Sequence, residues 1–202
     1  QAGGLGWIGK NTTLINPALG SYTFLGSALL DVALPAPPIH QLPSCGTCTR
    51  CLDACPTGAL VSPGVLDARR CLSYLTIENR GPIPEQFREA VGTRLFGCDT
   101  CQDVCPWNRK PIAAQAGQAV PKLATLYLPD LLKLDAAAFR ARFRTTPIWR
   151  ATPTGLARNA AIVLGNLGDP AAATYLKAAA AEHPSPMVRE AAAWAVHRLD
   201  AF

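Results

Sequence analysis

The sequence predicts a predominantly helical α+β protein in which a cysteine-rich module precedes a C-terminal part made of helical repeats. Three observations support this prediction. Seven of the eight cysteines fall in two short runs, a stretch with strand-like composition precedes them, and three helix-start signals follow one another in the last fifty residues. At 202 residues and 49% hydrophobic content, the chain is long enough to bury a core of ordinary size.

The two cysteine runs have the spacing of ligands to cubane iron–sulfur clusters. They read Cys45-x2-Cys48-x2-Cys51-x3-Cys55-Pro56 and Cys98-x2-Cys101-x3-Cys105-Pro106. A [4Fe–4S] cube needs four thiolates, and in two-cluster ferredoxins the cysteine before proline binds the cube of the other run. The second run has only three cysteines, so Cys71 is the cysteine left to complete the set.

This arithmetic predicts a ferredoxin-like module with two clusters and uses every cysteine. The predicted ligands of the first cluster are Cys45, Cys48, Cys51 and Cys105, and those of the second are Cys55, Cys71, Cys98 and Cys101. Disulfides are one alternative, but cysteines three residues apart are poorly placed to bridge each other, and nothing resembles a signal peptide. Two all-cysteine zinc sites are the other alternative. The density of the runs and their Cys-Pro endings favour iron–sulfur cubes.

Composition and charge narrow the possible surroundings and partners. No run of about 18 apolar residues occurs, so no membrane span is expected, and the thiol-rich sequence predicts a reducing cytoplasm. The formal charge of +5 is uneven, because residues 111–202 carry ten Lys and Arg against six Asp and Glu. Within them, Arg140, Arg142, Arg144 and Arg150 stand without an intervening acid. Such a stretch attracts the phosphates of nucleic acid, the alternative being a basic helix face that is only solvated.

The beginning of the chain looks like the middle of a domain. The first residue is Gln1 and the only methionine is Met187, so we expect an N-terminal part of the protein to be lacking. Gly4, Gly6 and Gly9 formally match the dinucleotide-binding fingerprint, but that motif requires a preceding strand. A tight turn that needs glycine is therefore the favoured interpretation.

The middle of the chain predicts short elements between breaks. Residues 22–30 are rich in β-formers and predict a buried strand. Prolines between residues 35 and 43 predict a linker that leads into the first cysteine run. Residues 56–60 and 66–71 predict helical turns beside the clusters, and residues 85–95 predict a short helix.

The last fifty residues predict three helices. Thr152-Pro153, Asp169-Pro170 and Ser185-Pro186 each place a capping side chain before a proline at the first helical position. The first helix should end at Gly168. Its predicted buried face consists of Leu156, Ala160, Val163 and Leu167.

A repeat is visible in the same part of the chain. Residues 158–161 (Arg-Asn-Ala-Ala) and 189–192 (Arg-Glu-Ala-Ala) lie 31 residues apart, which is a period typical of HEAT-like helix-pair solenoids. Such stacks expose long surfaces for binding polymers. The alternative is a plain helical cap on the cysteine-rich module.

Several segments, taken in this order, resemble the epoxyqueuosine reductases. They are residues 6–11 (Gly-Trp-Ile-Gly-Lys-Asn), the stretch around residues 24–26, the first cysteine run, residues 71–78, the second run with its Cys-Pro-Trp-Asn ending, and the helix with Arg158, Asn159 and Ala160. The cysteine runs alone are shared with many ferredoxins, but this combination is much more specific and covers nearly the whole chain. The resemblance implies a protein that uses cobalamin and two [4Fe–4S] clusters to reduce epoxyqueuosine to queuosine at the wobble position of tRNA.

The resemblance also implies a division of the chain. Residues 1–40 would be the remnant of an α/β cobalamin-binding catalytic domain, and residues 41–112 a two-cluster ferredoxin-like domain. Residues 113–150 would be a helical connector, and residues 151–202 a HEAT-like repeat. The implied cobalamin contacts are Ser27, Ser73, Cys98 and Asp99. The resemblance and the basic character of the C-terminal half together predict the residues that contact tRNA. They are Arg80, Arg140, Arg142, Arg144 and Arg158.

In the family that the chain resembles, the first cluster lies next to cobalamin and the second receives electrons from an external donor protein. The family's proton-donating acid precedes the glycine-rich segment, so we predict no catalytic residue here and expect this chain alone to be inactive. A monomer is expected. Two other functions stay open: a non-catalytic two-cluster electron carrier, which would bind neither cobalamin nor tRNA, and a relative of reductive dehalogenases, which would share both cofactors but would hardly need the basic tail.

Overall fold

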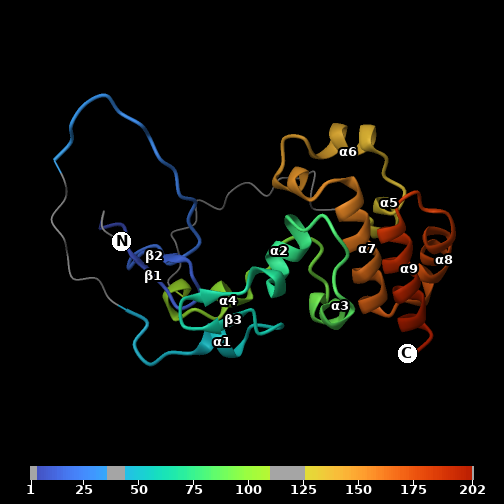
Figure 1. Ribbon diagram of the computed structural model, residues 1–202, viewed down its shortest axis with the longest axis horizontal. Coiled ribbons are helices and arrows are strands. Elements are labelled where there is room, and N and C mark those ends of the chain that lie inside the picture. The colour runs from blue at the N-terminus through green and yellow to red at the C-terminus, as the bar shows by residue number, and fades with distance from the viewer. Residues whose placement is uncertain (1–3, 36–43, 110–125, 202) are drawn as a thin grey trace. The chain divides into compact units, whose positions relative to one another are not determined.

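The chain forms two compact units (Figure 1). The structure is a computed structural model that describes residues 4–35, 44–109 and 126–201. The first unit consists of residues 1–68 and 99–118, and the second of residues 69–98 and 119–202. The predicted domain boundaries at residues 40 and 112 lie outside the described residues. The predicted cluster domain is divided between the units, because residues 69–98 pack with the C-terminal helices. Within the described ranges, no helix has the length and apolar character needed to cross a membrane.

The glycine-rich start of the first unit is a tight hairpin. Strand β1 (Trp7–Ile8) pairs antiparallel with β2 (Leu14–Ile15), and Trp7 stands opposite Ile15. Gly6 has a φ of 155°, and a Cβ atom on it would collide with the carbonyl of Ile15. Only glycine permits this close approach, which confirms the tight-turn interpretation of the glycine pattern.

The segment that follows corrects one prediction. Residues 22–30 form no strand, and nearly all of their side chains are exposed, Phe24 and Leu29 completely so. A strand-like composition expresses how well side chains pack on a pleated surface beside a neighbouring strand. None of the described residues pairs with this segment as a strand, so the buried-strand prediction is wrong.

The cysteine runs of the first unit fold into short helical turns. Helix α1 (Arg50–Asp53) and helix α4 (Thr100–Asp103) have the same length and pack against each other. A 3-10 turn, η2 (Pro106–Asn108), follows Cys105. Strands β3 (Leu60–Ser62) and β4 (Val65–Leu66) form a second hairpin. The helical turn predicted for residues 56–60 is therefore wrong, because Gly58, at a φ of 58°, turns the chain into β3.

The second unit is helical. It contains α2 (Leu72–Ile77), α3 (Glu85–Val91), α5 (Leu128–Leu131), α6 (Ala136–Phe143), α7 (Pro153–Leu167), α8 (Ala173–Glu182) and α9 (Pro186–Leu199). Three 3-10 turns complete the described elements: η1 (Ala68–Arg70), which begins at the last residue of the first unit, η4 (Pro147–Ala151) and η5 (Pro170–Ala172). Helix α3 ends at Val91, earlier than predicted. The turn predicted for residues 66–71 corresponds to η1.

Helix α7 is the centre of this unit, because every side chain from Gly155 to Gly165 is buried. It packs against α2, α3, α5 and α9, and α8 packs against α9 (Figure 1). A Cβ atom on Gly165 would lie 2.7 Å from the Cβ of Ala195, so glycine sets the close approach of α7 and α9. Such close contact between small residues is what the alanine-rich sequence allows.

The three helix starts lie where the sequence places them. Thr152 accepts a hydrogen bond from the Gly155 N–H and caps α7, while Asp169 accepts one from the Ala171 N–H. Helix α8 begins after the short turn η5, and α9 begins at Pro186. Gly168 adopts the left-handed conformation at the end of α7, as predicted. Leu167 is half exposed, however, so the prediction that it belongs to the buried face of α7 is wrong.

Candidate iron–sulfur site

Four thiols of the first unit line one cavity of about 40 Å³. They are Cys45, Cys48, Cys51 and Cys105, the four predicted ligands of the first cluster. In the described part of the chain, no three potential ligand side chains converge closely enough for a single metal ion. A cube holds its thiolates around a volume, so four thiols facing one cavity are a fitting donor set for it.

Aromatic and aliphatic side chains form the dry side of this site. Cys105 is buried against Trp7 and Ile15, and Cys45 and Trp107 pack against the same group of apolar side chains. The Trp7 and Trp107 rings meet edge to face, with their centroids 4.8 Å apart. The β1–β2 hairpin and the turn after Cys105 therefore cover the thiols together. An apolar shell of this kind keeps water away from a redox centre and helps to set its potential.

Lys10 holds the loop between the first two cysteines. Its ammonium donates hydrogen bonds to the carbonyls of Gly46 (2.7 Å) and Cys48 (2.9 Å). Its backbone N–H points at the sulfur of Cys45, at 3.5 Å. Lys10 also lines the cavity, so its positive charge lies beside the thiols. No role was predicted for Lys10, although a lysine in the loop of a glycine-rich hairpin is a signal for contact with a neighbouring backbone segment.

The Cys-Pro-Trp-Asn ending has a structural reason. Asn108 accepts a hydrogen bond from the Ser21 N–H (2.7 Å) and donates one to the Gln102 carbonyl (2.8 Å). A Cβ atom on Gly20 would collide with the Asn108 side chain. Asn108 thus joins the N-terminal segment to α4, while Trp107 packs on Trp7.

Cys55 lies in a group of hydrogen-bond donors. Burial raises the pKa of its thiol, but donation from the N–H groups of Leu60, Thr57 and Ala59 outweighs burial and lowers the pKa below its usual value. The Ala59 N–H lies 3.2 Å from the sulfur. In Cys51, by contrast, burial dominates and raises the pKa. A thiolate that receives several N–H groups is suited to bind a cluster, because such bonds stabilise its negative charge.

The four predicted ligands of the second cluster belong to both units. Cys55 and Cys101 lie in the first unit, and Cys71 and Cys98 lie in the second. Cys71 immediately precedes α2, and Cys98 packs against the apolar core of the second unit.

The residues that the resemblance implies for cobalamin lie on different elements. Ser27 is exposed in the segment after the hairpin, and Ser73 is partly buried in α2. Asp99 is exposed and accepts a hydrogen bond from Gln102 at 2.9 Å.

Most of the arginines expected to contact tRNA are accessible. Arg80, Arg140 and Arg144 are exposed, while Arg142 is partly buried with its guanidinium over the Phe143 ring. Arg80 donates a hydrogen bond to the carbonyl of Arg150 at 2.8 Å. Arg80 therefore lies beside Arg150, at one end of the basic stretch.

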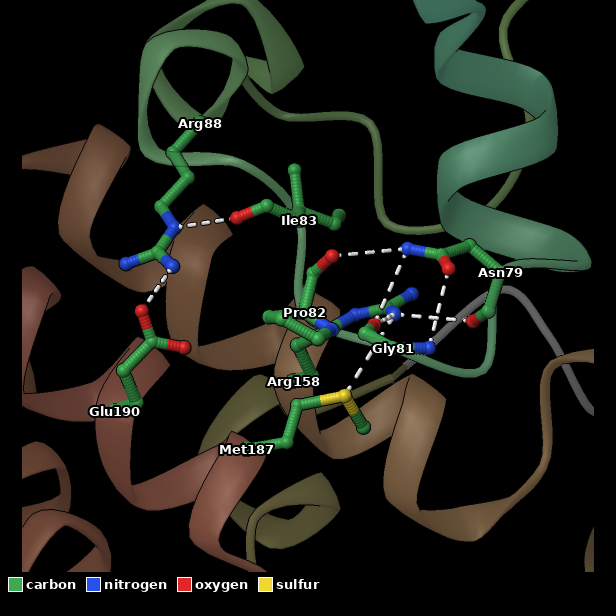
Figure 2. A network of polar contacts seen from close by, with 8 residues as sticks. All are labelled: Asn79, Gly81, Pro82, Ile83, Arg88, Arg158, Met187 and Glu190. Atoms are coloured by element: carbon green, nitrogen blue, oxygen red, sulfur yellow. Dashed lines mark hydrogen bonds and ion pairs between the residues drawn. The ribbon is translucent and has the colours of Figure 1, made fainter. Parts of the chain in front are cut away.

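Arg158 is an exception, and its predicted contact with tRNA is wrong. The side chain is 1% exposed, and its guanidinium donates to the Leu75 carbonyl at 2.7 Å. It also donates to the carbonyls of Asn79 (3.0 Å) and Gly81 (Figure 2). Burial, with a smaller effect from Arg80 and Arg88, lowers its pKa to about 10, so it stays charged at neutral pH. A guanidinium whose donors are used inside the protein cannot reach a phosphate.

These features define a class of protein, the two-cluster iron–sulfur proteins. Residues 44–108 match the family model for a 4Fe-4S double cluster binding domain, and this range contains all eight cysteines. The match favours iron–sulfur cubes over the alternative of two zinc sites. None of the eight cysteines forms a disulfide.

Comparisons with whole proteins show which proteins the chain is similar to. The chain is 45% identical to an epoxyqueuosine reductase of Pseudomonas aeruginosa over 98% of its own length and 55% of that protein. The solved epoxyqueuosine reductase of Streptococcus thermophilus is 34% identical and superposes with a TM-score of 0.87 over 98% of this chain and 52% of that one. A crystal structure of an epoxyqueuosine reductase with an epoxyqueuosine-modified tRNA stem loop is also 34% identical, with a TM-score of 0.81 over 96% and 52% of the two chains. The chain is similar to epoxyqueuosine reductases over almost its whole length and spans about half the length of the relatives it matches.

Proposed function

We propose that the protein to which this chain belongs reduces epoxyqueuosine to queuosine in tRNA. The observation that carries the proposal is the similarity to epoxyqueuosine reductases over almost the whole chain, including one solved with a modified tRNA stem loop. Opening an epoxide to an alkene consumes two electrons and two protons and releases one water. Two [4Fe–4S] clusters suit this chemistry, because each carries one electron at a time at a strongly reducing potential.

The residues of the first unit fit a cluster in the cavity lined by Cys45, Cys48, Cys51 and Cys105. Besides four thiols, a cluster needs hydrogen-bond donors toward its sulfur atoms, and these set its potential. The Lys10 N–H already points at a cysteine sulfur. The Trp7 indole N–H is buried among the apolar side chains beside the cavity and has no hydrogen-bond partner among the described residues. It can therefore donate to a sulfur atom of the iron–sulfur cluster.

For the second cluster we propose the ligands Cys55, Cys71, Cys98 and Cys101. The match of residues 44–108 to a double-cluster domain supports two clusters, and these four thiols are those that the first cluster does not use. The donors around Cys55 support its role as a bound thiolate.

We propose cobalamin as the further cofactor, with Ser27, Ser73, Cys98 and Asp99 near it, and this proposal rests on the family resemblance. Residues 1–40 would then be part of a larger cobalamin-binding domain. The exposed apolar side chains between residues 24 and 34 support that assignment, because soluble monomers rarely leave such a patch uncovered. We also propose a cytoplasmic monomer that takes electrons from a donor protein, since eight cysteines without a disulfide suit a reducing compartment.

For the second unit we propose a HEAT-like helical repeat that presents arginines to tRNA. Helices α7 and α9 carry the two copies of the repeat and pack on each other, which supports the assignment. The exposed arginines of the basic stretch and Arg80 beside it are the proposed phosphate contacts.

The test of the proposed function uses the full-length protein, loaded with both clusters and cobalamin and supplied with a low-potential reductant. We expect it to convert epoxyqueuosine to queuosine in a tRNA stem loop, as measured by mass spectrometry of the nucleosides, and to change the absorption spectrum of cobalamin on binding. A cluster-loaded protein that leaves the cobalamin spectrum and the modified base unchanged would be an electron carrier. Turnover of an organohalide instead would indicate the dehalogenase function.

Lys10 provides a prediction about the first cluster alone. Replacing Lys10 with methionine keeps a long unbranched side chain but removes a positive charge and two hydrogen bonds to the cysteine loop. The reduced cluster carries one more negative charge than the oxidised cluster, so losing the ammonium should lower the reduction potential of the first cluster, on the order of tens of millivolts. An EPR-monitored redox titration measures this, with the second cluster as internal reference.

Arg50 is the matched control, because it also lines the cavity and carries the same charge. The Arg50→Gln variant should shift the potential less, since its guanidinium is exposed and solvent screens it. Equal shifts in the two variants would show that only total charge matters and that the Lys10 contacts to the loop do not.

A further inference from the structure

Helix α7 carries a buried polar pair that the proposed function does not use. Arg158 and Asn159 are adjacent, and both are almost completely buried. The Asn159 carbonyl oxygen accepts two hydrogen bonds from the Arg158 guanidinium, at 3.1 and 2.9 Å. A buried charged side chain is costly unless its donors are paired, so this pair is expected to serve a specific arrangement of the chain around it.

The remaining donors of the pair point at backbone carbonyls, and one Arg158 donor also contacts the Met187 sulfur at 3.9 Å. The Asn159 amide donates to the carbonyls of Thr76 (2.7 Å) and Leu95 (2.9 Å). Arg158 donates to the carbonyls of Leu75 and Asn79 and to that of Gly81, and Figure 2 shows its guanidinium against the turn that contains these last two. The last carbonyls of a helix have no partner within it. The pair therefore supplies the donors that the end of α2 lacks.

The carbonyls belong to two segments, and each segment carries a cysteine. Residues 75 and 76 lie in α2, one helical turn after Cys71, whose carbonyl accepts from the Leu75 N–H at 2.9 Å. Leu95 lies three residues before Cys98. Asn159 thus binds both cysteine-bearing segments through the two hydrogens of one amide group.

Thr76 joins the same two segments a second time. Its hydroxyl donates to the Leu72 carbonyl at 2.7 Å and accepts from the Gly97 N–H at 2.9 Å. Thr76 is completely buried, and Gly97 is the residue directly before Cys98. Two sets of buried and partly buried hydrogen bonds therefore fix the segment after Cys71 to the segment before Cys98.

We propose that Asn159, supported by Arg158 and Thr76, is a positioning residue for Cys71 and Cys98 as ligands of the second cluster. The inference rests on the proposed ligand set. A cube requires its four thiolates in a fixed arrangement, and the second unit supplies two of them from separate segments. Helix α7 is buried and central, so binding both segments to it presents the two thiols together. The C-terminal helical part would then have a task in cluster assembly as well as in binding RNA.

The test compares two asparagines of α7 that make the same kind of contact. Asn166 donates to the carbonyls of Arg88 (2.8 Å) and Gly92 (3.2 Å), in α3 and just after it, and so binds a segment without cysteines. The substitutions Asn159→Asp and Asn166→Asp each replace an amide donor with an oxygen of equal size. The Asn159→Asp variant keeps its acceptor for Arg158. Iron per chain is measured after anaerobic reconstitution, together with the EPR signal of each reduced cluster and the circular dichroism of the helices.

We expect Asn159→Asp to hold about four irons instead of about eight, with the signal of the first cluster and the helix content retained. Asn166→Asp should keep about eight. Full iron content in Asn159→Asp, with iron released to a chelator at the wild-type rate, would overturn the inference while leaving the ligand set intact. Equal loss in both variants would also overturn it, because packing alone would then explain the result. A wild-type chain with only one cluster would overturn the ligand set and the inference together.

Discussion

Replacing Cys71 with alanine should reduce the iron content of the anaerobically reconstituted chain from about eight atoms to about four. Cys71 is the one cysteine outside the two runs, and the proposed second cluster has no other thiol to take its place. A cube with three protein thiolates is labile, whereas the cavity lined by Cys45, Cys48, Cys51 and Cys105 lies within the first unit and keeps all its ligands. Iron and sulfide analysis, with EPR of the reduced protein, measures the loss.

The matched substitution is Cys48→Ala, which removes a thiol from the cavity of the first unit. It should abolish the first cluster and leave the signal of the second. The two variants together assign each EPR signal to its ligand set. Loss of both clusters in Cys71→Ala, with normal helix content, would contradict the proposed assignment. Zinc in place of iron in the wild-type chain would contradict the iron–sulfur interpretation altogether.

Removing Arg140 and Arg144 together should weaken the binding of the full-length protein to tRNA and flatten its dependence on salt. Both side chains are exposed in a stretch without acidic residues. An arginine that neutralises a phosphate releases a counterion, so each lost contact should reduce the slope of log affinity against log salt by roughly one unit. Fluorescence anisotropy with a tRNA stem loop at several salt concentrations measures affinity and slope in the Arg140→Gln, Arg144→Gln double variant.

The control is a Lys133→Gln, Lys177→Gln double variant, because both lysines are exposed in the same unit and the total charge removed is equal. Its affinity and slope should stay closer to those of the wild type. Cluster content should be unchanged in both variants, since none of the four residues is a cysteine or a proposed cluster ligand. If the two double variants behaved alike, the basic stretch would be a solvated surface that attracts RNA only through its net charge. Phosphate contacts position the RNA, so base specificity must come from elsewhere in the protein.

Arg158 is the arginine whose predicted role the structure contradicts. Arg158 was predicted to contact tRNA, and Arg189 occupies the equivalent position of the repeat. Arg158 lies on the most deeply buried helix and satisfies the carbonyls of α2, whereas Arg189 donates to the carbonyls of His183 and Pro184 beside its own helix. A repeat fixes the position of a residue within its helix. It does not fix what packs against that helix, which depends on residues some 80 positions away.

The sequence by itself determined the features that depend on neighbours along the chain. Cysteine spacing, the proline-marked starts of α7 and α9 and the glycine at the end of α7 act within a few residues, so they could be predicted without the fold. Only the tertiary structure decided the features that depend on distant partners. The Lys10 contacts to the cysteine loop span more than 30 residues, those of Asn159 span more than 60, and the strand-like residues 22–30 stay exposed because strand formation requires a partner. Local rules fix elements and spacings, whereas long-range contacts decide which of them become buried and which side chains hold the thiols in place.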